Sequence, residues 1–213
     1  MSDDLAQRLN QYVKDLFVRE DDILRFVRHQ TEAHGLPLIN LQPHEGKLLQ
    51  LLVMLLGAER AVEVGTLAGY SAIWIARGLP AHGQLTTIEH SSKHAALARA
   101  HIERAGLSDK VTVLQGDGRQ ILRKLQVDAP YDLIFIDADK VSYPHYLEWA
   151  AANLRVGGAV LAHNAFWGGG IFRPDTADGL GVVQFNQTLA DHPQFASTII
   201  EVGDGLALGV KTS

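Results

Sequence analysis

Short apolar runs alternate with amphipathic stretches from about residue 60 onward. Each run is four or five residues long and is rich in valine, isoleucine and leucine. We expect strands at Ala61–Val64, Leu85–Glu89, Val111–Leu114, Leu133–Asp137 and Ala159–Ala162. Helical patterns separate them at about 70–78, 91–105, 117–125 and 142–153. Strands alternating with helices in this way predict a parallel sheet covered on both faces, with right-handed crossovers.

The two ends of the chain carry different patterns. Residues 3 to about 30 place apolar side chains at helical spacing, and another helix begins near Pro43. After a helix near 180–191, strand patterns flank Gly203-Asp-Gly205, which indicates an antiparallel hairpin. The predicted class is α/β, and 213 residues fit one domain, with N-terminal helices over 1–58 and an α/β core over 59–213. The apolar stripe near the N-terminus consists of Leu5, Leu9, Tyr12, Val13, Leu16 and Phe17.

Composition narrows the function classes. The formal net charge is −5 and no dense run of Lys and Arg appears, which argues against nucleic-acid binding. Cysteine is absent, so disulfides, thiolate metal sites and thiol catalysis are excluded. The apolar run Leu48–Leu56 is too short to cross a bilayer, and the Met-Ser-Asp-Asp start lacks the features of a signal peptide. We expect a cytoplasmic protein with no membrane partner.

A glycine-containing loop follows the first strand, in the sequence Glu63-Val-Gly65-Thr-Leu-Ala-Gly69-Tyr-Ser71. Glycine lets the backbone approach a ligand closely, and the next helix offers free N–H groups. The spacing is neither a dinucleotide fingerprint nor a P-loop, and Glu63 would repel a phosphate. A ligand with a cationic or zwitterionic end is therefore favoured, although the loop is also compatible with an ordinary tight turn.

Acidic residues end the next two strands. Glu89 lies roughly 20 residues beyond the glycine loop, where an acid binds ribose hydroxyls in nucleoside-binding α/β folds. The alternative is a neighbour of a helix N-cap or a solvated acid. Asp117, within Gly116-Asp-Gly118, could contact an adenine amine or cap the following helix. Together with the loop, the two acids indicate a nucleoside pocket without a phosphate site.

The fourth and fifth strands end in residues suited to chemistry. Asp137-Ala-Asp139-Lys140 follows one apolar run, and His163-Asn164 closes the next. Ligands bind beyond the carboxyl ends of the strands in open α/β sheets, so a carboxylate, an amine, an imidazole and an amide should converge there. Such a set could hold a divalent cation and manage a proton.

These motifs, in this order, resemble those of class I S-adenosylmethionine-dependent methyltransferases. The resemblance is closer still to the cation-dependent O-methyltransferases that include catechol and caffeoyl-coenzyme A O-methyltransferases, and it covers nearly the whole chain. It rests on Glu45-Gly-Lys-Leu-Leu, Glu63-Val-Gly-Thr-Leu-Ala-Gly-Tyr-Ser, Phe135-Ile-Asp-Ala-Asp-Lys140, the Asn-x-x-Trp of Asn164 to Trp167, and Val202-Gly-Asp-Gly-Leu. The Asp-Ala-Asp-Lys run after an apolar strand is the most specific of them.

The resemblance implies a Rossmann-like, doubly wound, mostly parallel seven-stranded sheet with an antiparallel C-terminal hairpin. It implies methyl transfer from S-adenosyl-L-methionine to one hydroxyl of a vicinal aromatic diol, a small phenolic substrate, assisted by a divalent metal. Lys140 would be the general base, provided its surroundings favour the neutral amine, and Asp137 and Asn164 would be metal ligands. The family often forms homodimers, so a homodimer is expected. The implied cofactor-binding residues are Leu41, Glu63, Gly65, Thr66, Ser71, Glu89, Asp117, Gly118 and Asp137.

One position departs from the family pattern. The residue before Asn164 is normally an aspartate in the family and is His163 in this chain. Two carboxylates and an amide suit Mg²⁺, whereas an imidazole suits Mn²⁺ or another softer metal. Three outcomes stay open: His163 is a ligand of such a metal, His163 is the base of a metal-independent enzyme, or the site is impaired and only binds the cofactor. A nucleotide-dependent oxidoreductase is disfavoured because the dinucleotide fingerprint is absent.

Overall fold

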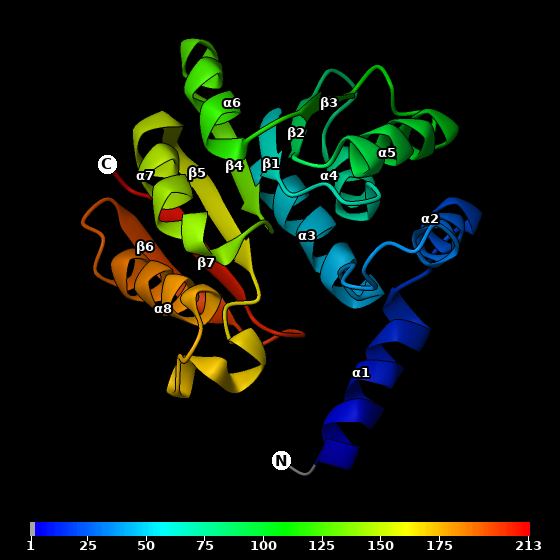
Figure 1. The fold of residues 1–213 in the computed structure, drawn as a ribbon, viewed down its shortest axis with the longest axis horizontal. Helices are drawn as coiled ribbons and strands as arrows, with labels where there is room; N and C mark the ends of the chain where they lie inside the picture. The colour runs from blue at the N-terminus through cyan, green and yellow to red at the C-terminus, as the bar shows by residue number, and fades with distance from the viewer. Residues whose placement is uncertain (1–2) are drawn as a thin grey trace.

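The computed structural model describes residues 3–213, which contain one seven-stranded sheet with helices on both faces (Figure 1). Its strands are β1 (Arg60–Val64), β2 (Gln84–Glu89), β3 (Val111–Gln115), β4 (Tyr131–Ile136), β5 (Leu154–His163), β6 (Phe195–Ile200) and β7 (Leu206–Lys211). Their order across the sheet is β3-β2-β1-β4-β5-β7-β6. Strands β1 to β5 pair in parallel, and β7 runs antiparallel between β5 and β6. The predicted parallel sheet with an antiparallel C-terminal hairpin is confirmed.

Helices cover the sheet in two groups that enclose two apolar cores. The helices are α1 (Asp3–Phe17), α2 (Asp22–Ala33), α3 (Pro43–Leu56), α4 (Tyr70–Gly78), α5 (Ser92–Arg104), α6 (Gly118–Leu125), α7 (Tyr143–Asn153) and α8 (Ala177–Ala190). One core packs α2 to α5 against one face of the sheet, through residues such as Val53 and Ile73. The other packs α6 to α8 against the opposite face, through residues such as Leu147 and Phe185.

The strand ends position the residues singled out from the sequence. Strand β4 ends at Ile136, so Asp137 is the first residue beyond it. A short 3-10 turn over Lys140–Ser142 precedes α7 and is capped by Asp139, whose Oδ2 accepts the Ser142 N–H at 3.1 Å. Strand β5 begins at Leu154, earlier than its apolar pattern predicts, because an irregularity in its pairing with β4 lets it include a polar stretch.

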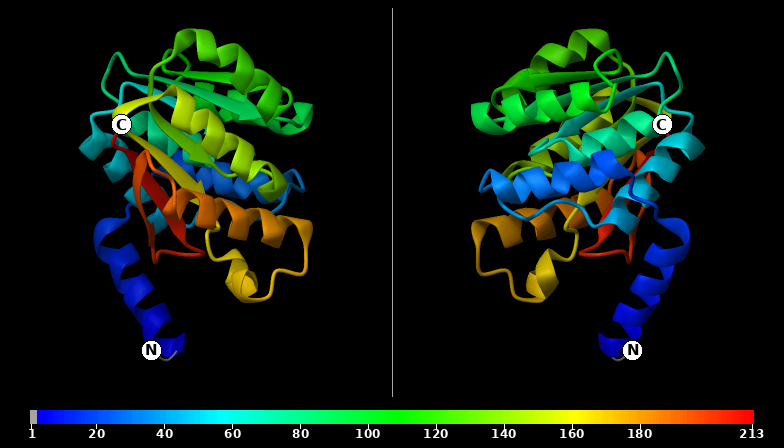
Figure 2. Two further views of the ribbon diagram at one scale, coloured as in Figure 1. Left: turned by 90° about the vertical axis from the view of Figure 1, so that its left-hand side faces the viewer. Right: turned by 90° about the vertical axis from the view of Figure 1, so that its right-hand side faces the viewer.

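Helix α1 extends away from the rest of the structure, as both side views show (Figure 2). The helical pattern expected over residues 3 to about 30 forms two helices, α1 followed by α2. The described part of the chain leaves much of the apolar stripe of α1 uncovered, because each of the six residues is between 40% and 65% exposed. Lys14, on the same helix, donates to Gln42 Oε1 at 3.4 Å and so links α1 to the start of α3.

Two expectations concern the chain as a whole. Over residues 3–213, no helix combines the length and apolarity needed to cross a membrane. The division into N-terminal helices and an α/β core within one domain stays a prediction.

Candidate active site

The carboxyl ends of the parallel strands open into one cavity of about 1040 Å³. Its lining extends from the segment that precedes α3 to the loop that follows β5. All but one of the residues expected to bind the cofactor or to carry the chemistry line it. These are Leu41, Gly65, Thr66, Ser71, Glu89, Asp117, Gly118, Asp137, Lys140, His163 and Asn164.

The glycine loop brings β1 and β4 into direct backbone contact. Gly65 has φ +99°, which is in the range that favours glycine, and a Cβ there would overlap the carbonyl oxygen of Asp137. The close approach therefore requires glycine at position 65. It also places the glycine loop directly against Asp137, the first residue after β4.

Glu89 organises the loop as well as lining the cavity. Its Oε2 accepts the N–H groups of Thr66 at 3.3 Å and Leu67 at 2.8 Å, and its Oε1 accepts that of Ser91 at 2.8 Å. Asp117 is also used locally, since its Oδ1 accepts the Gln120 N–H at 2.9 Å and caps α6. Both acids line the cavity, so a local role and a ligand-facing position are combined in each.

Glu63 is the expected cofactor residue that does not line the cavity. It lies inside β1 rather than at its end, and it is fully buried. Burial raises the pKa of its carboxyl to about 7, despite hydrogen bonds from Ser71 and Thr87 that act in the opposite direction. Its Oε1 has no hydrogen-bond partner. Glu63 is thus a carboxyl held just behind the loop, with one oxygen unsatisfied.

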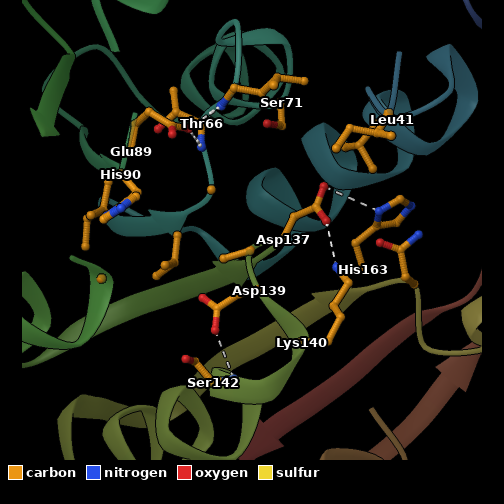
Figure 3. A pocket seen from close by; sticks show the side chains of 18 of the residues that line it. Leu41, Thr66, Ser71, Glu89, His90, Asp137, Asp139, Lys140, Ser142 and His163 are labelled. Atoms are coloured by element: carbon orange, nitrogen blue, oxygen red, sulfur yellow. Dashed lines mark hydrogen bonds and ion pairs between the residues drawn. The ribbon is translucent and has the colours of Figure 1, made fainter. Parts of the chain in front are cut away.

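Asp137 lies between the glycine loop and the basic side chains of Lys140 and His163 (Figure 3). Its Oδ1 is 3.2 Å from Lys140 Nζ. Lys140 is buried and also donates to the hydroxyl of Tyr143 at 2.6 Å. That hydroxyl in turn contacts the carbonyl oxygens of Ile136 at 3.2 Å and His163 at 3.0 Å. Two oxygen atoms, Asp137 Oδ1 and the Tyr143 hydroxyl, therefore hold the Lys140 amine near the carboxyl end of β4.

His163 is buried between two carboxylates. Its Nε2 is 3.1 Å from Glu45 Oε1, and its Nδ1 is 3.4 Å from Asp137 Oδ2. Burial alone would lower the pKa of His163, but the carboxylates of Asp137 and Glu45 outweigh it and raise the pKa to about 9. Burial would raise the pKa of Asp137, and the neighbouring His163 and Lys140 outweigh it and lower that pKa. The pair is consequently an imidazolium beside a carboxylate at neutral pH.

Asn164 follows β5 in the left-handed region, with φ +58°. Its amide Nδ2 donates to Asp204 Oδ2 at 3.1 Å, which leaves the amide oxygen as the atom still available to a ligand. Among the side chains that the structure describes, no three from His, Asp or Glu gather in a way that could hold a metal ion. The set expected from the sequence is of another kind, with one carboxylate, one imidazole and one amide.

Two site residues were not given a role by the sequence. Glu45, on the first turn of α3, contacts His163 across 118 positions of the chain, which no local pattern reveals. Tyr143 lies three residues after Lys140 at the start of α7, a spacing that brings side chains together in helical turns. That spacing is the signal that could have identified it.

The fold and this cavity define a class of enzyme in which a nucleoside-containing cofactor and a second substrate meet beyond the ends of parallel strands. The chain belongs to the O-methyltransferase family, whose model matches residues 14–212. It is an O-methyltransferase with the class I S-adenosylmethionine-dependent fold.

Individual relatives agree over almost the full length. The chain is 38% identical to a catechol O-methyltransferase of Niastella koreensis, with 99% of each chain covered. It is 37% identical to the O-methyltransferase of Bacillus cereus solved in complex with SAH, with a TM-score of 0.90 and 96% and 97% of the two chains covered. For the O-methyltransferase TomG of Streptomyces achromogenes, solved with SAM, the identity is 34%, the TM-score 0.92 and the coverage 100% of both chains.

Proposed function

We propose that this enzyme transfers a methyl group from S-adenosyl-L-methionine to one hydroxyl of a catechol-like vicinal aromatic diol. The observation that carries the proposal is the single cavity in which the glycine loop and Glu89 face one end and Asp137, Lys140 and His163 the other. Relatives with similar sequences are catechol O-methyltransferases or have been solved with SAM or SAH. These likenesses support both the donor and the acceptor class.

The donor would bind along the loop side of the cavity. Glu89 would accept hydrogen bonds from the ribose hydroxyls, and Asp117 with Gly118 would face the adenine. Gly65 and Thr66 would contact the amino-acid part of the donor through their backbone, with Ser71 and Leu41 beside it. Glu63, with its unsatisfied Oε1, would provide negative charge behind the loop for the donor's ammonium group.

The reaction itself is an in-line displacement. The phenol loses its proton, its oxygen attacks the methyl carbon, and the carbon–sulfur bond breaks to release S-adenosylhomocysteine. Holding the oxygen close to the methyl carbon contributes several kcal/mol in such reactions. Lys140 would take the proton, since its Nζ is held by Asp137 and Tyr143 beside the cavity. His163 is less suited to this task, because its two ring nitrogens already face the carboxylates of Glu45 and Asp137.

One observation supports the fit of a divalent metal to the residues present. His163 Nδ1 is buried without a hydrogen-bond partner beside Asp137, while Nε2 is taken by Glu45. Ligating imidazoles commonly hold their second nitrogen in this way. Asp137, His163 Nδ1 and the amide oxygen of Asn164 would hold the ion, and Mn²⁺ or another softer metal is favoured over Mg²⁺. When bound, the metal would lower the pKa of the phenol and orient both diol oxygens.

The test is methylation of catechol and its substituted derivatives, after EDTA treatment and after adding Mg²⁺, Mn²⁺, Co²⁺ or Zn²⁺. Resorcinol is the matched control acceptor, because its two hydroxyls are not adjacent. We expect product from the vicinal diols, increased by Mn²⁺ or a similar metal, and little from resorcinol. If no diol is methylated with any metal although S-adenosylmethionine binds, the proposal fails and a protein that only binds the cofactor is the better description.

The remaining proposals concern binding partners and cellular location. A homodimer is proposed, supported by the exposed apolar stripe of α1, which a second subunit would cover. Nucleic acid and membranes are not proposed as partners, in keeping with the net charge of −5. The expected cytoplasmic location stays a prediction.

A further inference from the structure

Glu45 is a buried carboxylate whose two oxygens have different partners. Its Oε2 accepts the backbone N–H of Gln42 at 2.6 Å, which holds the first turn of α3. Its Oε1 faces Nε2 of His163 at 3.1 Å. One side chain therefore joins the start of α3 to the carboxyl end of β5, and it does so with only 6% of its surface exposed.

The contact with Glu45 determines which ring nitrogen of His163 faces the carboxylate of Asp137. An ionised carboxylate only accepts hydrogen bonds, so the Nε2 atom next to Glu45 must carry a proton. With Nε2 held there, Nδ1 faces Asp137 at 3.4 Å and has no hydrogen-bond partner of its own. A ring turned the other way would lose the bond to Glu45.

A second element, the turn between β6 and β7, also lies against the carboxylate. Gly203, in the turn between β6 and β7, has φ +54°, and a Cβ at that position would overlap Oε1 of Glu45. The turn can lie against the carboxylate only because residue 203 has no side chain. Glu45 is thus held by its helix, by His163 and by the backbone of the C-terminal hairpin.

We propose that Glu45 is a positioning residue for the reaction: held against Gly203, it fixes the His163 ring with Nε2 toward α3 and Nδ1 toward Asp137. The inference rests on the proposed function for its consequence, the alignment of Nδ1 with the acceptor end of the cavity. The placement of the ring itself is a property of the protein alone and is tested separately from methylation.

The experiment compares four variants with the wild-type enzyme. Glu45→Ala removes the acceptor, Glu45→Gln keeps an oxygen that can accept the Nε2–H bond, and Gly203→Ala displaces the carboxylate without removing any polar group. Gly57→Ala is the matched control for the glycine variant. Gly57 has a similar φ of +59°, but a Cβ there meets nothing within 4 Å. Binding of S-adenosylhomocysteine, measured by calorimetry, establishes that each variant is folded.

The first readout is NMR of ¹⁵N-histidine-labelled protein, with the His163 signals assigned from a His163→Asn variant. A slowly exchanging Nε2–H proton is expected in the wild type, Glu45→Gln and Gly57→Ala, and rapid exchange in Glu45→Ala and Gly203→Ala. The second readout is kinetic: removing the partner of a ligand-like imidazole costs about 10- to 100-fold in activity, and here we expect it in kcat with the donor's affinity within about twofold.

Slow exchange of the Nε2–H proton in folded Glu45→Ala and Gly203→Ala would overturn the inference, as would wild-type kcat in both. If the wild type methylates no diol, the NMR comparison still decides whether Glu45 orients His163. Failure of the proposed reaction and failure of the positioning role are therefore distinguishable.

Discussion

Lys140 Nζ lies 3.2 Å from Oδ1 of Asp137, and the two side chains form an ion pair just beyond the carboxyl end of β4. Lysine acts as a base only as the neutral amine, which cannot form an ion pair. The ion pair must therefore weaken when the acceptor binds, for example when the Asp137 carboxylate engages another cation. This requirement makes Lys140 the first residue to test.

Replacing Lys140 with methionine should lower kcat by about 100-fold or more, since general-base catalysis typically contributes that much. The affinity for S-adenosylhomocysteine should change little, because most residues proposed to bind the donor lie on other elements. Lys124→Met, at an exposed position of α6, is the control and should behave as the wild type. Unchanged kcat in Lys140→Met would assign the proton transfer to another group.

Metal binding should depend on pH because a proton and a metal compete for His163. The pKa of His163 is raised to about 9, so at lower pH an ion bound through Nδ1 must displace a proton. The apparent affinity for Mn²⁺ should then rise about tenfold per pH unit and level off above about pH 9. Calorimetry in buffers of different ionisation enthalpy measures the released proton. An affinity independent of pH from 6.5 to 9 would exclude coordination by this ring.

His163→Asp should convert a stabilising cation into a third carboxylate beside Asp137 and Glu45. Like charges at this distance repel, so the melting temperature without metal should fall by several degrees. Mg²⁺ should restore it and should support methylation, because the ligand set becomes the two carboxylates and amide that suit this ion. His163→Asn, which adds no charge, should show a smaller loss and no such rescue. Thermal melts with and without Mg²⁺ distinguish the two.

Glu63→Gln should stabilise the free enzyme at pH 8 while weakening donor binding. The folded-state pKa of about 7 lies above the ordinary value of 4.5, so the folded protein holds a proton that the unfolded chain has already released. Stability therefore falls as pH rises from 4.5 to 7, by up to roughly 3 kcal/mol for a shift of this size. The variant should lack this loss in urea unfolding at pH 5 and pH 8. Equal pH dependence in both proteins would contradict the assignment.

Introducing glutamate at Leu9, Tyr12 and Leu16 should dissociate the proposed dimer, because these positions form the exposed apolar stripe of α1. Asn10→Glu, at an exposed polar position of the same helix, is the control and should not change the assembly. Sedimentation velocity over a range of concentrations measures the mass. A monomeric wild type at all concentrations would remove the proposal.

The fold and the general location of the site follow from local features of the sequence. Alternation of strand and helix predicts the sheet, and the rule that ligands bind at carboxyl strand ends places Asp137 and His163 together. Glu63 shows the limit of that rule. It precedes the strand end by one residue, and the alternation of side chains along a strand turns it into the interior instead of the cavity.

Other features depend on tertiary packing that no local pattern contains. Glu45 reaches His163 only because α3 packs beside β5 and a glycine in the last hairpin leaves room for its carboxylate. The stripe of α1 predicts a helix with a buried face, and the sequence gives no indication of what buries it. An amphipathic pattern shows that one face of a helix is apolar. It does not show which surface covers that face.

The backbone contact between Gly65 and Asp137 has a consequence for engineering this enzyme. Because Gly65 and Asp137 approach each other through their backbone atoms, the distance between the glycine loop and the end of β4 does not depend on neighbouring side chains. Ile39, Trp167 and Asp178, which also line the cavity, can therefore be varied in a search for altered substrate preference without changing this backbone contact. Every member of such a library would keep the close approach of Gly65 and Asp137.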